Sequence, residues 1–139
     1  PFKFEAGTPD IAGIIGLGAA VDFINSIGMQ TIHDYEKELV DYTIQRLSEF
    51  DEVVIYAKDA EHSGAVSFNL KFDGVHSSDV GMILDKKGIA VRTGHHCAQP
   101  IMHHFNIPGT VRASFAVYNT KEEIDTFIEG LKTSIRMLG

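Results

Sequence analysis

The stretch from 92 to 100, which reads RTGHHCAQP, concentrates the side chains of this sequence that could do chemistry. It holds a cation, two imidazoles, a flexible glycine and Cys97, the single cysteine of the chain. The thiolate is the nucleophilic form of cysteine, and nearby cations or imidazolium raise its fraction. A lone cysteine is often a small core residue, but the neighbours here are polar and favour a turn. The pattern therefore predicts a reactive thiol at Cys97, supported by His95 and His96.

A metal site is the competing interpretation of the same region. The potential ligands within ten residues are His95, His96, Cys97, His103 and His104. Zinc ligands are usually spaced two to five residues apart so that their side chains converge. The members of each adjacent histidine pair point in different directions, so we expect no native metal here. A small metal-binding protein stays open as an alternative, and it would require stoichiometric zinc after purification without a His tag.

Two arginines fall at the polar phase of predicted strands whose other phase is apolar. If the strands of Arg92 and Arg112 are neighbours, both guanidinium groups emerge on the same non-core face, beside the loop that carries Cys97. Guanidinium forks bind carboxylate or phosphate groups in a bidentate manner. The alternative is that both arginines are solvated charges at the edge of the sheet.

Composition narrows the class of protein. With 139 residues, 44% hydrophobic and 22% charged, the chain is typical of one globular domain. Lys and Arg number 12 against 19 Asp and Glu, and the net charge of -7 argues against nonspecific binding to nucleic acid or anionic membranes. No apolar run reaches the roughly 18 residues of a membrane span. A single cysteine excludes an internal disulfide framework and predicts a reducing, cytoplasmic location.

The first predicted helix spans 9–27 and is apolar nearly all round. Pro9 suits a position in its first turn, and Gly28 is placed to end it. A helix of this kind must be buried on more than one side. We therefore expect the isolated chain to fold but to expose an apolar patch here, and either to self-associate or to displace its N-terminal segment.

The remaining predicted helices and strands must position the candidate reactive side chains. Hydrophobic periodicity predicts further helices at 31–50 and 78–87, and a final helix that begins with a capping box between Thr120 and Glu123. Alternation of apolar and polar residues, or a short apolar run, predicts strands at 52–56, 66–70, 89–92 and 111–117. The order indicates an α+β fold in which helices pack on one face of a small sheet.

The RTGHHCAQP string at 92–100 resembles the cysteine motif of the SufS-type, or group II, cysteine desulfurases, which are related to selenocysteine lyases. Residues 4–9 (FEAGTP) and 13–17 (GIIGL) resemble the segment that leads out of the large domain of that family. Residues 111–115 (VRASF) and 118–123 (YNTKEE) resemble its final strand and helix. The similarity covers essentially the whole chain, and group I members differ by a longer, serine-rich cysteine loop.

The resemblance implies a pyridoxal phosphate enzyme of fold type I, the aspartate aminotransferase type. In that family the Schiff-base lysine lies in the large domain in a Ser-x-His-Lys context, which no lysine of this sequence has. The implied organisation is a connecting helix at 1–28, leading from a missing cofactor-binding domain, and a C-terminal small domain at 29–139. The isolated chain is accordingly expected to be inactive.

Roles for individual residues follow from the same resemblance. Cys97 corresponds to the sulfur-accepting nucleophile and Arg112 to the arginine that binds the substrate carboxylate. Arg92 corresponds to a cation at the mouth of the site. Thr8 lies in a segment that reaches the cofactor phosphate of the neighbouring subunit in a homodimer.

The implied reaction moves sulfur from L-cysteine to Cys97 as a persulfide and releases L-alanine, with pyridoxal phosphate as the electron sink. An acceptor protein of the SufE or SufU kind would take the sulfur onward for iron–sulfur cluster assembly. Two alternatives stay open at this point. The chain could be a non-catalytic module that docks a sulfur acceptor, or part of a selenocysteine lyase.

Overall fold

The computed structural model describes residues 3–139. The predicted connecting helix at 1–28 therefore has its first two residues outside the described part of the chain. Contacts divide the chain into two compact units, Pro1–Asp34 and Tyr35–Gly139. The division at 28/29 that the sequence suggests stays a prediction.

The first unit contains helix α1, Ile11–Ile27. The side chain of Asp10 caps it by accepting a hydrogen bond of 3.0 Å from the N–H of Gly13. The helix consequently starts after Asp10, and the prediction that Pro9 lies in its first turn was wrong, because Asp10 is the capping residue and Pro9 precedes it. Gly28, at φ 93°, ends the helix as predicted.

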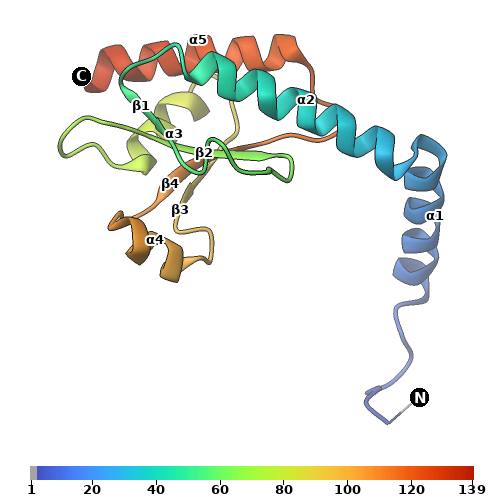
Figure 1. Ribbon diagram of the computed structural model, residues 1–139. Helices are drawn as coiled ribbons and strands as arrows, with labels where there is room; N and C mark the ends of the chain where they lie inside the picture. The colour runs from blue at the N-terminus through green and yellow to red at the C-terminus, as the bar shows by residue number, and fades with distance from the viewer. Residues whose placement is uncertain (1–2) are drawn as a thin grey trace. The chain divides into compact units, whose positions relative to one another are not determined.

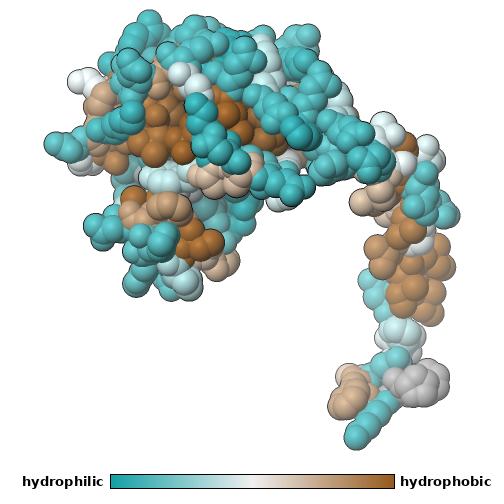
Figure 2. All heavy atoms as spheres, viewed as in Figure 1, coloured by the Kyte–Doolittle hydropathy of each residue, from teal (hydrophilic) through white to brown (hydrophobic). Residues whose placement is uncertain are grey.

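Large apolar side chains are exposed along α1, and none of the described residues of this helix is buried. Figure 2 shows the apolar colour gathered over the helix labelled α1 in Figure 1. Within residues 3–139, no helix taken singly has the length and apolar character to cross a membrane. Helices α1 and α2 (Met29–Leu47) pass that test only together, as a bent pair, on length and composition.

The second unit is built on a four-stranded antiparallel sheet in the order β1-β2-β4-β3. The strands are β1 (Val53–Ile55), β2 (Ala65–Leu70), β3 (Arg92–Gly94) and β4 (Thr110–Ser114). Figure 1 shows α2 and α5 (Lys121–Leu138) on one side of this sheet and α4 (Gln99–Phe105) on the other. Helix α3 (Ser77–Asp85) shares the core of α2 and α5. The predicted α+β class is confirmed.

The core lies between the sheet and helices α2, α3 and α5. Along β2 the residues Val66, Phe68 and Leu70 are buried and alternate with half-buried residues, as the period of a strand requires. The rings of Phe68 and Phe127 meet edge to face with centroids 5.8 Å apart. Each such side chain contributes about 1.5–3 kcal/mol by leaving water. This burial holds the sheet in the register that builds the site.

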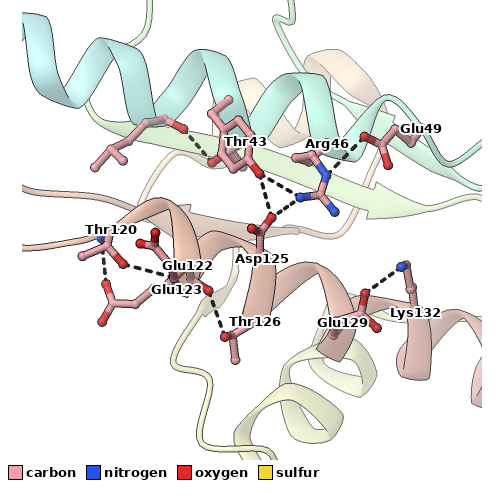
Figure 3. A network of polar contacts seen from close by, with 12 residues as sticks. Thr43, Arg46, Glu49, Thr120, Glu122, Glu123, Asp125, Thr126, Glu129 and Lys132 are labelled. Carbon is pink, nitrogen blue, oxygen red and sulfur yellow. Dashed lines mark hydrogen bonds and ion pairs between the residues drawn. The ribbon is translucent and has the colours of Figure 1, made fainter.

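Helix α5 begins with the predicted capping box, which is confirmed. Thr120 Oγ1 accepts from the N–H of Glu123, and the Glu123 carboxylate accepts from the N–H of Thr120 at 3.0 Å. A polar network then joins α5 to α2, where Tyr42 donates to Asp125 at 2.8 Å and Arg46 pairs with the same carboxylate. Figure 3 shows the contacts of Thr120 at the start of α5 and the pair that Arg46 makes with Asp125.

Two predicted strands differ from the observed ones. The prediction at 89–92 was wrong for residues 89–91, and β3 instead comprises Arg92–Gly94, because the N–H of Ile89 bonds to Leu84 O and closes α3 instead of joining the sheet. The strand predicted at 111–117 ends at Ser114. Its partner β2 starts at Ala65, opposite Ser114. The N–H of Phe115 makes one further hydrogen bond, to Gly64 O at 2.7 Å, and the pairing ends there because Gly64, at φ 65°, leaves the extended conformation.

A helix was also missed, since α4 occupies the region that the sequence left as a loop. The ends of the other predicted elements differ from the observed ones by at most three residues.

Candidate active site

Arg92 and Arg112 are directly paired residues on β3 and β4. Directly opposite residues of an antiparallel pair project from the same face of a sheet. The two arginines therefore lie side by side on the face opposite the core, as expected if their strands were neighbours. Arg92 is exposed and Arg112 is half-buried, so Arg92 lies nearer to solvent than Arg112 does.

Cys97 lies in a tight turn directly after β3. The N–H of Ala98 donates to His95 O at 2.8 Å, and the two central residues, His96 and Cys97, have φ values of 52° and 58°. Positive φ at both central positions is the signature of a type I′ turn, which normally uses Gly, Asn or Asp. Each left-handed non-glycine residue costs about 1–2 kcal/mol. The cysteine therefore sits in strained backbone, a feature that gathers at functional sites.

Two histidine rings hold this turn. His95 Nδ1 lies 3.1 Å from the N–H of Cys97 and accepts its hydrogen bond. His96 Nε2 lies 3.1 Å from the carbonyl oxygen of Thr110 and 3.0 Å from its hydroxyl. Because a carbonyl oxygen only accepts, the hydrogen of the His96 ring is on Nε2. The turn is thereby fastened to the buried first residue of β4.

The surroundings of His96 favour its neutral form. Burial lowers the pKa of His96 below its ordinary value, and donation to the Thr110 backbone offsets part of that effect. The guanidinium groups of Arg112 and Arg92 lower the pKa of His96 further, because they repel a second positive charge. Its Nδ1 is buried with no hydrogen-bond partner among the described residues. Neutral His96 thus presents a free acceptor inside the site.

The thiol of Cys97 is exposed, and its sulfur lies 4.0 Å from Arg92 Nη2. Sulfur is therefore accessible from solvent on one side and faces a guanidinium on the other. A thiol in this position can attack a molecule that approaches from outside the chain. The arrangement suits a nucleophile and does not suit a core cysteine.

A cavity of about 340 Å³ adjoins the turn on the same face of the sheet. It lies among β2, β4 and α4, with the rings of Tyr56 and Phe105 packed at a centroid distance of 5.3 Å. The residues that carry its polar groups are Tyr56, His62, Ser67, His96, Thr110 and Arg112. Arg112 Nε is buried and has no partner among the described residues. A free Nε–H beside the Nη groups is the fork that a carboxylate accepts.

Two of the sequence-based hypotheses concern residues outside this arrangement. Thr8 is exposed in a bend of the first unit, and its role toward a neighbouring subunit stays a prediction. His103 and His104 belong to the last turn of α4. In the described part of the chain no three His, Cys, Asp or Glu side chains are grouped to hold a metal ion.

Sequence reasoning missed three contributors to the site: α4, Thr110 and His62. Pro100 in the first turn of α4 and the left-handed Asn106 at its end were signals that could have revealed that helix. His62 lines the cavity, with its Nδ1 3.1 Å from Ala65 O. No local signal pairs Thr110 with His96, because that contact depends on which strands become neighbours.

Comparison with known proteins agrees with this geometry. Residues 1–127 match the family model described as aminotransferase class-V, and the chain belongs to that family. Family members in general depend on pyridoxal phosphate. The relatives of this chain include a cysteine desulfurase of Serratia proteamaculans (strain 568), which is 46% identical to it over 139 residues. That match covers 100% of this chain and 34% of the relative, so the chain spans about a third of the length of the curated relatives it matches.

Solved structures point the same way. The apo structure of a cysteine desulfurase from Thermococcus onnurineus NA1 superposes with a TM-score of 0.88 at 46% identity, covering 99% of this chain and 34% of that one. The cysteine desulfurase CsdA (S-sulfonic acid) from Escherichia coli gives a TM-score of 0.89 at 34% identity and covers 100% of this chain and 34% of that one.

The described residues were tested for a fit to pyridoxal phosphate. Among those that line the cavity beside Cys97 there is no lysine, the residue that forms a Schiff base with this cofactor. The cavity therefore does not form a complete cofactor site.

Proposed function

We propose that this chain is the cysteine-bearing C-terminal domain of a SufS-type cysteine desulfurase, in which Cys97 takes sulfur from L-cysteine. The observation that carries the proposal is the exposed Cys97 sulfur, 4.0 Å from Arg92, in a strained turn beside the paired Arg112. The likeness to cysteine desulfurases over the whole chain supports it. The short turn between β3 and α4 favours group II over group I, whose cysteine loop is longer.

The transfer step conserves atoms and electrons. The Cys97 thiolate attacks the sulfur of L-cysteine, an S–S bond forms, and the C–S bond of the substrate breaks. The electron pair of that bond passes to the substrate carbon, which takes a proton and leaves as part of L-alanine. Pyridoxal phosphate, when bound by another part of the protein, supplies the electron sink that this cleavage requires.

Arg112 holds the substrate by its carboxylate in this proposal. Its unpartnered Nε–H and the adjacent Nη group offer two parallel donors on the face that also carries the thiol. Because Arg112 is half-buried, a carboxylate bound there is partly shielded from water and is held more strongly than at an exposed arginine. Arg92 faces the sulfur at the mouth of the site.

The wider assignment follows from the same proposal. A persulfide on an exposed Cys97 is open to an acceptor protein of the SufE or SufU kind, for iron–sulfur cluster assembly in the cytoplasm. This chain has one cysteine, so no second thiol of the same chain segment competes for that persulfide. A homodimer, in which Thr8 contacts the cofactor phosphate of the other subunit, completes the arrangement. The isolated chain is expected to be inactive.

The test uses the full-length protein that contains this chain. Cys97→Ser should abolish alanine release from L-cysteine and the persulfide detected by mass spectrometry, while pyridoxal phosphate still binds. Ser48→Ala changes an exposed residue just after α2 and is the control, which should keep both products. Turnover by Cys97→Ser at the unaltered rate would remove Cys97 from the mechanism and overturn the proposal.

A further inference from the structure

The turn that carries Cys97 receives little support from secondary structure. Strand β3 ends at Gly94 and α4 begins at Gln99. Within the described sheet, residues 95–98 pair with no strand. The turn has one backbone hydrogen bond across it, from the N–H of Ala98 to His95 O. Two left-handed residues in such a turn need further contacts to hold them.

His95 supplies one of these contacts as an acceptor. Its Nδ1 accepts from the N–H of Cys97, two residues along the chain, at 3.1 Å. This is the spacing at which an Asn or Asp oxygen closes an Asx turn. A ring nitrogen that accepts carries no hydrogen, so His95 acts here through a lone pair and not through a charge. An asparagine oxygen at this position can therefore make the same bond.

His96 supplies the other contact as a donor. Its Nε2 bonds to the carbonyl oxygen and hydroxyl of Thr110, a residue that is 2% exposed. Thr110 stands two residues before Arg112 on the same strand. The ring thus fastens the turn to the strand that carries Arg112. Because this contact joins the turn of Cys97 to the strand of Arg112, the distance between the Cys97 thiol and the Arg112 guanidinium depends on His96.

We propose that His95 and His96 are positioning residues for the Cys97 thiol, His95 by fixing the backbone of Cys97 and His96 by fastening the turn to β4. This inference rests on the proposed function, because that function makes the position of the thiol matter. It assigns neither ring a role in proton transfer. The two histidines act on the sulfur through the backbone between them.

The first experiment compares His95→Ala with His95→Asn in the 139-residue chain. Amide hydrogen exchange at Cys97 reports the turn, and the rate of alkylation by iodoacetamide reports the thiol, which is the only one in the chain. His95→Ala should speed exchange and slow alkylation by about 2- to 10-fold each, the effect of losing one hydrogen bond. Alkylation slows because the freed sulfur spends less time beside Arg92. His95→Asn should restore both values.

His103→Ala removes an exposed imidazole from α4 and is the matched control, with both rates unchanged. Unaltered exchange in His95→Ala would overturn the proposal. So would a folded His95→Asn that behaves like His95→Ala, because the ring would then act by charge or proton transfer. Neither readout involves sulfur transfer. A failure here therefore leaves the proposed function standing, and a failed alanine assay leaves this result unaffected.

The second experiment changes the other ring. His96→Gln keeps an N–H donor of similar reach, whereas His96→Ala removes it. Alkylation of Cys97 should slow in His96→Ala and recover in His96→Gln, with circular dichroism confirming that both variants are folded. If His96→Ala unfolds, the same measurement on Thr110→Val, which removes only the hydroxyl, should show a smaller slowing. Wild-type rates in both His96→Ala and Thr110→Val would overturn the role of His96.

Discussion

The two faces of the sheet differ in what they do, although the same strands build both. On β4 the adjacent residues Val111 and Arg112 point to opposite faces. Val111 is fully buried in the core, and Arg112 lines the cavity beside the cysteine turn. Strand β4 therefore contributes a core residue on one face of the sheet and a residue of the candidate site on the other.

The contrast extends to the state of the polar groups. The core face is apolar and closely packed, whereas the site face holds the unpartnered atoms His96 Nδ1 and Arg112 Nε and the left-handed residues of the turn. Such features cost free energy. The comparison indicates that burial of apolar side chains on the core face stabilises a fold whose other face carries strained backbone and polar atoms without hydrogen-bond partners. Substitutions on the two faces should accordingly separate stability from activity.

The largest effect is expected on the core face. Phe68→Ala should lower the free energy of unfolding by about 3–5 kcal/mol, because it removes a fully buried ring and leaves a cavity. Urea unfolding measures this loss, and Phe68→Leu, which fills most of the space, should cost less. Below the unfolding transition, alkylation of Cys97 should stay close to wild type. A folded Phe68→Ala with a greatly altered thiol would show that the faces are not independent.

Arg112→Lys tests the site face in the full-length protein. An ammonium group cannot offer two parallel donors to a carboxylate, so KM for L-cysteine should rise about 10- to 100-fold. The melting temperature should change little, because the Nε of Arg112 has no partner among the described residues. Arg136→Lys, at an exposed position of α5, is the control and should leave KM unaltered. A wild-type KM in Arg112→Lys would make Arg112 a solvated strand residue.

Thr120→Ala changes a residue of the helix layer and should have a smaller effect on stability. Loss of the capping box at the start of α5 should cost about 1 kcal/mol in the free energy of unfolding. Thr120→Ser keeps the hydroxyl and should recover most of it. Thermal unfolding of both variants, with Cys97 alkylation measured alongside, checks that the change is confined to stability.

The smallest effect is a dependence of stability on pH. Because the pKa of His96 is lowered in the folded chain from its ordinary 6.5, the unfolded chain takes up the proton first as pH falls. The contribution of His96 to stability is therefore full above pH 6.5 and is lost as pH falls through its folded pKa. Urea unfolding from about pH 8 to 5 should show this loss in the wild type. His96→Asn, which tolerates positive φ but does not titrate, should lack that component.

Local patterns predicted a large share of the fold. The alternation of Val66, Phe68 and Leu70 and the capping box at Thr120 depend on neighbours in sequence, and the structure confirms them. Strand ends were less predictable. Phe115 continues the alternation of β4, and its N–H still bonds to Gly64 O at 2.7 Å. The strand nevertheless stops at Ser114, because the chain opposite leaves the extended conformation at Gly64, whose φ is 65°.

For the site, the sequence by itself determined which residues could do chemistry and on which phase of a strand they lie. A single thiol at Cys97, two adjacent histidines and the arginines at 92 and 112 were all visible there, since the phase of a strand is a property of its own backbone. Only the tertiary structure decided that Arg92 stands opposite Arg112, that His96 reaches Thr110 and that Cys97 adopts a left-handed conformation. These facts depend on the register between strands distant in sequence, and that register is set by burial of the core on the other face of the sheet.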